Sequence, residues 1–219
     1  MTTPLGTLET LDTPQGRSRV AALRRRTRET EITVRVALDG TGDATIATGV
    51  GFYDHLLNSL AHHSLIDLKI EATGDLDVDD HHTVEDVALV LGAAIASALG
   101  DRAGIRRFGS ATVPMDEALA TAAIDIGGRP YAVIDLPFRA EKIGALSSQL
   151  VEHALEAFAQ TSGSTLHLGG TGRNDHHLAE AAFKALALAL RAACEPDRRR
   201  SDVASTKGSL GSSTKGSLE

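Results

Sequence analysis

Hydrophobic and polar residues alternate along much of the chain with one of two periods, and each period predicts a kind of element. In TEITVRVAL, residues 30–38, every second residue from Ile32 to Leu38 is aliphatic, which is the pattern of a half-buried strand. In TVEDVALVLGAAIASALG, residues 83–100, hydrophobic residues recur at helical spacing instead, and Gly100 is placed to end the helix. The first half of the chain therefore predicts strands at 30–38 and 44–50, a helix at 51–64, a strand at 65–73 and a helix at 83–100.

The second half of the chain repeats this order of elements. It predicts paired strands at 109–128 and 129–138 around the Gly127–Gly128 turn, then a helix at 146–163, a strand at 164–170 and an Ala-rich helix at 176–194. Polar residues recur at nearly equal offsets between the halves: 98 residues from His55 to His153, and 95 from His81 to His176 and from Glu85 to Glu180. Such offsets indicate an internal duplication.

The predicted fold is α+β, a tandem duplication of a β-β-α-β-α half. We expect the first repeat at 20–104 and the second at 105–195. Residues 1–19, rich in Thr, Pro and Gly, predict a flexible arm, and 196–219 predict a flexible tail. The tail contains STKGSL at 205–210 and again at 213–218, and two origins are open for the second copy, a native repeat or an appended sequence.

Composition and charge narrow the classes of function. A net charge of −7 argues against general nucleic-acid binding, which needs a basic surface. The arginines near residues 24–28 and 198–200 are expected to be solvated charges near flexible ends. The single cysteine, Cys194, predicts a packed hydrophobe in a reducing compartment. The N-terminus does not read as a secretory signal and the apolar runs fall short of a membrane span, so we expect a cytoplasmic protein with no membrane partner.

Two histidine doublets are the strongest candidates for chemistry. DDHHTVED at 79–86 and NDHHLAE at 174–180 share the pattern HHxxE in a chain with nine histidines. On a helix, the first histidine and the glutamate share a face, whereas the second histidine is rotated by about 100° and serves a different ion more readily. We expect two cross-braced metal sites, one with His81, Glu85 and His177 and one with His176, Glu180 and His82, each completed by His55 or His153.

The ligand types limit the metals, and simpler explanations exist for single histidines. Nitrogen and oxygen ligands without thiolate suit Mn, Fe, Co, Ni or Zn, and open coordination positions indicate catalysis. A lone histidine pair is more often surface polarity or helix capping, with Asp79 and Asp80 as caps, but two copies at matched offsets argue against that. Three histidines without such counterparts are assigned to structure: His62, His63 and His167.

Seven motifs, in order between about residue 21 and residue 210, resemble the imidazoleglycerol-phosphate dehydratase family. They are GFYDHLLNSLAHHS, DDHHTVEDVALVLG, RFG…PMDEAL, GGRPY, QLVEHAL, GRNDHHLAEAAFKALALAL and STKGSL. The resemblance implies a hydro-lyase of histidine biosynthesis that removes water from D-erythro-imidazole-glycerol phosphate to give imidazole-acetol phosphate. It implies two Mn²⁺ per active site and a 24-subunit shell with active sites at subunit interfaces. The implied halves are four-stranded sheets backed by two helices, as in domain 2 of ribosomal protein S5.

The resemblance also implies roles for individual residues. Glu29 matches the family's carboxylate before the first strand and is the candidate base and a substrate-binding residue, with Glu31 as the competitor. Glu85 and Glu180 are metal ligands that could also shuttle protons. Asp116 and Glu117 are expected to support the site. The expected phosphate ligands are Arg107, Arg129, Lys184, Ser205, Thr206 and Lys207, with Arg106 and Lys215 as competitors for Arg107 and Lys207.

Two other functions are compatible with paired metal ligands. A dinuclear metallohydrolase would need a bridging aspartate, for which Asp80 and Asp175 are the nearby candidates. A non-catalytic metal-binding shell would have no phosphate pocket, so Arg107, Arg129 and Lys184 would not converge near the metals. The positions of these residues in the structure therefore distinguish the dehydratase, the metallohydrolase and the metal-binding shell.

Overall fold

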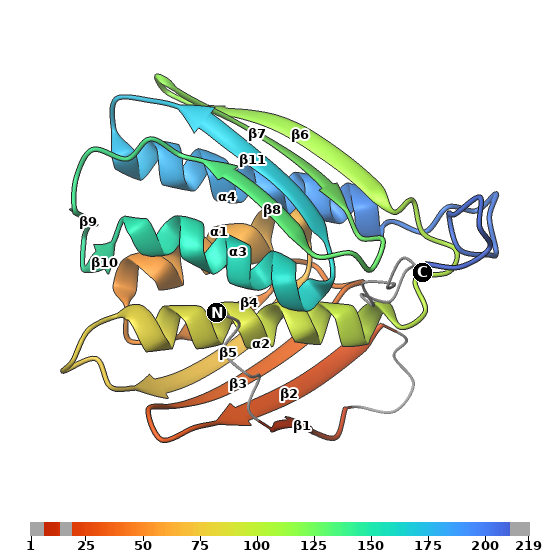
Figure 1. Cartoon of the computed structure of the whole chain (residues 1–219), viewed down its shortest axis with the longest axis horizontal. Coiled ribbons are helices and arrows are strands. Elements are labelled where there is room, and N and C mark those ends of the chain that lie inside the picture. The colour runs from red at the N-terminus through yellow and green to blue at the C-terminus, as the bar shows by residue number, and fades with distance from the viewer. Residues whose placement is uncertain (1–6, 14–18, 211–219) are drawn as a thin grey trace, which may run out of the picture.

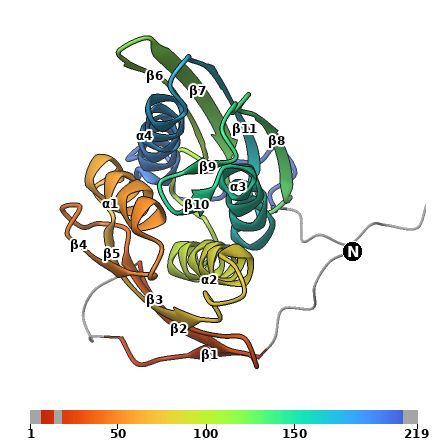
Figure 2. The ribbon, with the colours of Figure 1, turned by 90° about the vertical axis from the view of Figure 1, so that its left-hand side faces the viewer.

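The fold is a four-layer arrangement in which two sheets enclose two layers of helices (Figures 1 and 2). The structure is a computed structural model that describes residues 7–13 and 19–210. Within these residues, one continuous hydrophobic core of mainly Ala, Leu, Val and Ile side chains joins the layers. The aliphatic core accounts for the very low aromatic content of the chain, 3%.

The first half forms a five-stranded sheet with the order β1-β2-β3-β5-β4. All neighbouring strands in it are antiparallel except β4 and β5, which are parallel. Helices α1 and α2 cover its inner face. The elements are β1 (Leu8–Thr10), β2 (Val20–Arg26), β3 (Thr30–Ala37), β4 (Ala44–Ala47), α1 (Gly51–Ser64), β5 (Asp67–Gly74) and α2 (His81–Leu99).

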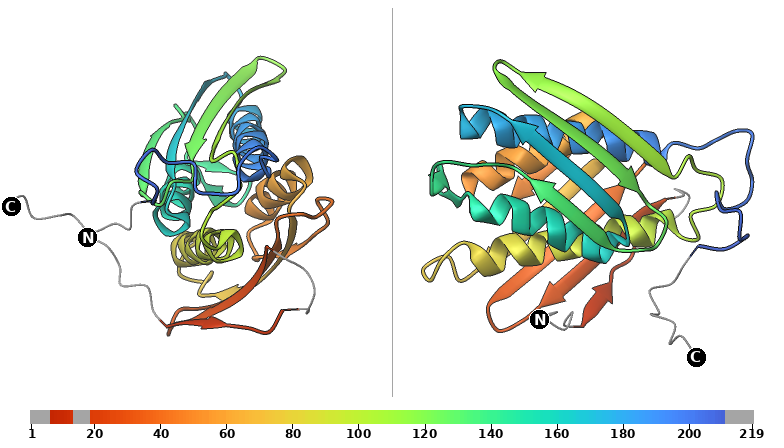
Figure 3. Two further views of the ribbon diagram at one scale, coloured as in Figure 1. Left: turned by 90° about the vertical axis from the view of Figure 1, so that its right-hand side faces the viewer. Right: turned by 45° about the horizontal axis from the view of Figure 1, so that its top comes forward.

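The second half forms a four-stranded sheet with the order β6-β7-β11-β8, which lies across α3 and α4 (Figure 3). A small hairpin of β9 and β10 is inserted between β8 and α3. The elements are β6 (Phe108–Met115), β7 (Ala118–Asp125), β8 (Tyr131–Asp135), β9 (Lys142–Ile143), β10 (Leu146–Ser147), α3 (Gln149–Ser162), β11 (Thr165–Thr171) and α4 (Asp175–Cys194).

The two halves share one topology, which confirms the predicted duplication and the α+β fold. If β2, β3, β5 and β4 are matched with β6, β7, β11 and β8, both sheets have the same strand order and the same single parallel pair. Helices α1 and α3 are both 14 residues long and occupy equivalent places. The helix layers meet through α1 with α4 and α2 with α3, so each short helix packs on the long helix of the other half.

Each half contains more strands than the hydrophobic pattern predicts. Strand β2, VAALRRR, lacks a polar–apolar alternation, and it went unpredicted. The predicted strand at 109–128 is a hairpin, β6 and β7, joined at Asp116 and Glu117. Asp116 has a φ of 48° in that turn, so the chain reverses without the Gly or Pro that usually signals a turn. The short strand β1 lies in the segment predicted as an arm.

One arginine of the cluster at residues 24–28 is buried, which corrects the expectation of solvated charges. Arg25 on β2 is 4% exposed and forms an ion pair with Asp86 on α2. The Thr30 hydroxyl of β3 donates a hydrogen bond to the same carboxylate. Arg25 therefore ties sheet to helix, since a buried charge requires a partner of this kind.

Glycine allows close contact between helix and neighbour at two points. A Cβ on Gly92 of α2 would lie 2.2 Å from the Thr161 Oγ1 and 2.6 Å from the Phe158 carbonyl oxygen of α3. A Cβ on Gly109 of β6 would lie 1.9 Å from the Ala189 carbonyl oxygen of α4. Both glycines thus let an element approach a helix backbone directly.

Two sequence expectations about the helices can be compared with the structure. Cys194 is 4% exposed, and burial raises the pKa of its thiol to about 12, which confirms the packed cysteine. Among the described residues, α2 alone is long and apolar enough to cross a membrane, with a mean hydropathy of 1.4, so the expectation that every apolar run falls short is wrong for α2. Most of α2 is buried, as the core helix of a globular domain would be.

Candidate metal centres

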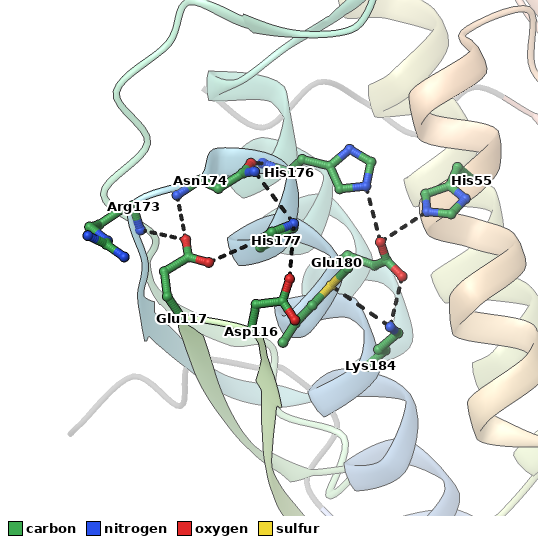
Figure 4. Close-up of polar contacts among 10 residues, drawn as sticks. His55, Asp116, Glu117, Arg173, Asn174, His176, His177, Glu180 and Lys184 are labelled. Carbon is green, nitrogen blue, oxygen red and sulfur yellow. Dashed lines mark hydrogen bonds and ion pairs between the residues drawn. The ribbon is translucent and has the colours of Figure 1, made fainter.

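The first cluster of ligand atoms, here called the α4 triad, consists of His55, His176 and Glu180. His55 lies on α1 of the first half, and the other two lie one turn apart on α4 of the second half. The Nε2 atoms of both histidines are 3.2 Å from the Glu180 Oε2 (Figure 4). Both imidazoles are half-exposed while Glu180 is nearly buried. The duplication thus places ligands from both halves around one point.

The second cluster, here called the α2 triad, is its counterpart: His81, Glu85 and His153. His81 and Glu85 lie one turn apart on α2, and His153 comes from α3. The His153 Nε2 is 3.2 Å from the Glu85 Oε1, and the His81 and His153 rings are 5.0 Å apart. In each triad, one ligand atom from every residue lies within 4.8 Å of the others.

The donor atoms of both triads fit a divalent transition metal. The His153 Nε2 is buried and lies 3.2 Å from the Glu85 Oε1 without the alignment of a hydrogen bond, which is costly unless the nitrogen has another partner. Two imidazoles and one carboxylate suit the metals from Mn to Zn. Three protein ligands leave positions open for water, substrate or further ligands.

The second histidine of each doublet faces away from its helix's triad. The His177 Nδ1 lies 2.9 Å from the Glu117 Oε2, and the His82 Nδ1 lies 3.0 Å from the Asp75 Oδ2. Within one chain, therefore, His177 does not join His81 and Glu85, and His82 does not join His176 and Glu180. A rotation of about 100° between adjacent helical residues turns each second histidine away from the triad of its own helix.

These carboxylate contacts resemble the support usually given to metal-binding imidazoles. Hydrogen bonding to Asp75 raises the pKa of His82, and hydrogen bonding to Glu117 raises the pKa of His177. The bond with His177, helped by the Asn174 amide, lowers the pKa of Glu117 to about 2. An imidazole whose Nδ1 is held by a carboxylate presents its Nε2 to a metal. Sequence reasoning had not identified Asp75, one of several aspartates in DLDVDD without a distinguishing signal.

Glu29 and its competitor Glu31 have different surroundings. Glu29 lies in the turn between β2 and β3, and its Oε2 is 3.9 Å from the His82 Nδ1. Glu31 lies on β3, where its carboxylate pairs with Arg24 and Arg26. Only Glu29 therefore lies near a histidine doublet. The turn that carries it, between β2 and β3, matches the turn between β6 and β7, whose Glu117 contacts His177.

Lys184 is the predicted phosphate ligand that lies at a triad. Its Nζ is 2.8 Å from the Glu180 Oε1 (Figure 4). Burial alone would raise the pKa of Glu180, but hydrogen bonds from Lys184 and His55 outweigh burial and lower the pKa to about 2. His63, which was assigned to structure, is close enough for the charge of Lys184 to lower its pKa, after the larger effect of burial.

The other predicted phosphate ligands lie at the opposite end of β6. Arg107 donates to both Asp125 oxygens, at 2.7 and 2.9 Å, and to the Ala204 carbonyl oxygen of the tail, at 2.6 Å. Arg129 is exposed and 4.0 Å from Asp125. Arg107 precedes β6, whereas Lys184 contacts Met115 at its far end, so the two cations are roughly 25 Å apart by strand length. One chain does not bring these ligands together.

The tail residues and the competing cations can also be placed. Ser205, Thr206 and Lys207 follow directly after the carbonyl that Arg107 holds, and Gly208 closes a turn onto Ser205. Arg106 pairs with Glu195 at 2.7 Å, which separates it from Arg107. Lys215 and the second STKGSL lie outside the described residues.

Asp80 and Asp175, the candidate bridging ligands of a metallohydrolase, have structural partners. Asp80 accepts hydrogen bonds from the backbone N–H and hydroxyl of Ser147, and Asp175 accepts from the amides of Arg139 and Ala140. Both carboxylates thus fasten the inserted segment around β9 and β10. This arrangement argues against the hydrolase.

A family model described as imidazoleglycerol-phosphate dehydratase matches residues 48–190. The chain is 54% identical over 194 residues to imidazoleglycerol-phosphate dehydratase of Cereibacter sphaeroides, covering 88% of this chain and 100% of the relative. It is 53% identical over 192 residues to the enzyme of that name from Methanoculleus marisnigri, with 88% and 100% covered.

Two solved structures are similar to the whole fold. The crystal structure of imidazoleglycerol-phosphate dehydratase from Staphylococcus aureus subsp. aureus N315 has a TM-score of 0.74 and 34% identity, covering 81% of this chain and 99% of that one. The structure of the Pyrococcus furiosus protein in complex with (S)-C348 has a TM-score of 0.74 and 36% identity, covering 85% and 99%. Sequence and fold therefore agree on one family.

Proposed function

The chain belongs to the imidazoleglycerol-phosphate dehydratase family, and from this premise we propose which of its residues carry the reaction. Its activity is that of a hydro-lyase, the removal of water from D-erythro-imidazole-glycerol phosphate to give imidazole-acetol phosphate in histidine biosynthesis. The observation that carries the assignment of residues is the pair of His/His/Glu triads.

We propose that each triad holds one Mn²⁺, giving two ions per active site. A bound divalent ion supplies Lewis-acid charge beside the imidazole of the substrate. His55, His176 and Glu180 would hold one ion, and His81, Glu85 and His153 the other. Glu85 and Glu180 are proposed as ligands first, with proton transfer through them as a second role.

His82 and His177 are proposed as further ligands donated between chains. Their Nδ1 atoms are held by Asp75 and Glu117, which orients each imidazole outside its own helix's triad. In the cross-braced scheme, His82 completes an α4 triad and His177 completes an α2 triad of neighbouring copies. Asp116 and Glu117 then serve as supports for His177.

Glu29 is proposed as the general base that takes the proton from the substrate carbon. Its carboxylate is exposed, free of arginine partners among the described residues, and directed at the side of His82. A base must be within hydrogen-bond reach of the proton it removes. If His82 binds the metal ion of a neighbouring copy, the adjacent Glu29 lies in the active site of that copy.

The substrate phosphate is proposed to bind cations from more than one copy. Lys184 lies at the α4 triad, whereas Arg107, Arg129 and the tail residues Ser205, Thr206 and Lys207 lie at the other end of β6. Since one chain separates these groups by roughly 25 Å, a complete phosphate site needs a second chain. This separation supports active sites at subunit interfaces, and we propose the 24-subunit shell that the family resemblance implies. The cytoplasm is proposed as its location, in line with the single buried thiol.

Mixing two inactive variants tests the shared site. Arg107→Met and Lys184→Met are dissociated with chelator, mixed in equal amounts and reassembled with Mn²⁺. If each site takes Arg107 and Lys184 from different chains, a fraction of the sites regains both cations, and the mixture recovers activity that neither variant shows alone. Reassembly of each variant by itself is the control. No recovery in the mixture, with wild-type protein recovering fully, would remove the proposal of a shared site.

A further inference from the structure

The two triads occupy equivalent places in the two halves and are unequal in electrostatics. We propose that they bind divalent metal in a fixed order: the α2 triad binds tightly and fills first, and the α4 triad binds more weakly because Lys184 competes with the ion for Glu180. The inference rests on the proposed metal function of the triads. It adds an order of filling, and it gives Lys184 a second role as the residue that sets the affinity of one site.

Lys184 makes the surroundings of the two triads unequal. It stands four residues after Glu180, and the residue four positions after Glu85 is Leu89. The Lys184 Nζ is 2.8 Å from the Glu180 Oε1, whereas Leu89 is an apolar side chain that is 8% exposed. Among the described residues, no lysine or arginine pairs with Glu85. Of the two equivalent carboxylates, only Glu180 is therefore bound to an ammonium group.

The segments that precede the two long helices also differ in charge. DLDVDD, residues 75–80, carries four aspartates just before His81, while TGRND, residues 171–175, carries Arg173 and one aspartate before His176. An open hollow of about 800 Å³ beside His176 is lined by Arg173 and by Arg139 and Lys142 of the inserted segment. Within one chain, the segment before α2 is thus more acidic than the segment before α4, and cations line one side of the α4 triad, which adds to the effect of Lys184 on a cation there.

The expected difference in affinity follows from the charges. A unit positive charge in contact with a ligand repels a divalent ion strongly enough to weaken binding by on the order of tenfold, even where water screens the interaction well. The difference is largest when Lys184 has no anion of its own. A tetrahedral anion bound to Lys184 would draw the ammonium from Glu180, so anion and second metal ion would each strengthen the binding of the other.

Titration of the metal-stripped protein with Mn²⁺ tests the order directly, by calorimetry together with electron paramagnetic resonance of the free ion. We expect two classes of site in the wild type, with Kd values at least about tenfold apart. His153→Gln should remove the tight class, and His55→Gln should remove the weak class. Lys184→Met should tighten the weak class by about tenfold, while Lys184→Arg, the matched control that keeps the charge, should leave the two classes apart.

The effect of sulfate on Mn²⁺ affinity is a second test, and it can be measured in the wild-type protein. In the wild type, sulfate should tighten the weak class, and in Lys184→Met it should have no such effect. Equal classes in the wild type, loss of the tight class in His55→Gln, or an unchanged weak class in Lys184→Met would each overturn the order. If one of these outcomes is found and the enzyme is still active only with metal, the order of filling is wrong but the proposed metal function of the triads is retained. If Mn²⁺ binds to neither triad, the proposed metal function is wrong as well.

Discussion

At the scale of single residues, the two histidines of each doublet perform separate tasks. His81 and His176 each join a glutamate of their own helix and a histidine of the other half. His82 and His177 contact carboxylates that lie beyond the helix start instead. The division follows from helix geometry, because adjacent residues point about 100° apart.

Glu29→Gln should keep metal and assembly but lose turnover. The substitution preserves size and removes the proton acceptor, so we expect kcat to fall by about 10²–10⁴. Glu31→Gln is the matched control, since the Glu31 carboxylate pairs with Arg24 and Arg26, and its kcat should stay within a few-fold of the wild type. Steady-state kinetics and metal content at equal particle size check both variants. Full activity in Glu29→Gln would exclude Glu29 as the base.

Residue identities could be predicted further than residue partners. Matched offsets identify His55, His153 and the two HHxxE patterns as one set, and the structure brings six of those side chains into two triads. The sequence does not say which short helix meets which long helix, because that depends on how the halves pack. Nor does it distinguish Asp75 from the aspartates around it.

At the scale of elements, the contact between α2 and α3 holds the α2 triad together. Gly92 makes this contact possible, because a side chain there would meet Thr161 and the backbone of α3. His81 and Glu85 lie on one of these helices and His153 on the other. The spacing of the helices therefore sets the spacing of the ligands.

Gly92→Ala should destabilise the protein by about 1–3 kcal/mol, because the added methyl overpacks a closed contact and outweighs the roughly 1 kcal/mol gain in helix propensity. Gly51→Ala at the start of α1 is the control, since nothing lies within 4 Å of a Cβ there. Urea unfolding of the metal-free protein measures both. An unchanged midpoint for Gly92→Ala would show that α2 and α3 are not in close contact.

Helices and central strands could be predicted from periodicity, and strands of mixed character could not. Strand β2 includes Arg25, whose burial depends on Asp86 far along the chain, so no local pattern marks it. The hairpin of β6 and β7 turns at Asp116 and Glu117, without the Asn-Gly or Asp-Gly pair that most strongly signals a two-residue turn. In both cases the missing information is tertiary.

At the scale of the whole molecule, both triads join the two halves of the chain. Each takes a short helix from one half and a long helix from the other. A bound metal would therefore link the halves, and histidines donated to neighbouring copies would link the chains. Motif spacing indicated paired sites, but the roughly 25 Å between Lys184 and Arg107 became visible only in the fold.

Chelation should dissociate the particle as well as stop the reaction, because ligands shared between chains couple metal binding to assembly. With metal, 24 chains of 22.9 kDa would give a particle of roughly 550 kDa. Light scattering during gel filtration measures the mass with chelator and after Mn²⁺ is returned. A particle that keeps its full mass after complete metal removal would argue against ligands shared between chains.

The most direct test of the central claim is turnover with defined metal. Metal-loaded protein is incubated with imidazole-glycerol phosphate, and the formation of imidazole-acetol phosphate is followed with and without chelator. We expect formation of product that stops on chelation and returns with Mn²⁺. A metal-binding shell without catalytic function would bind the ions and form no product. Absence of turnover with every divalent metal tested would contradict the account.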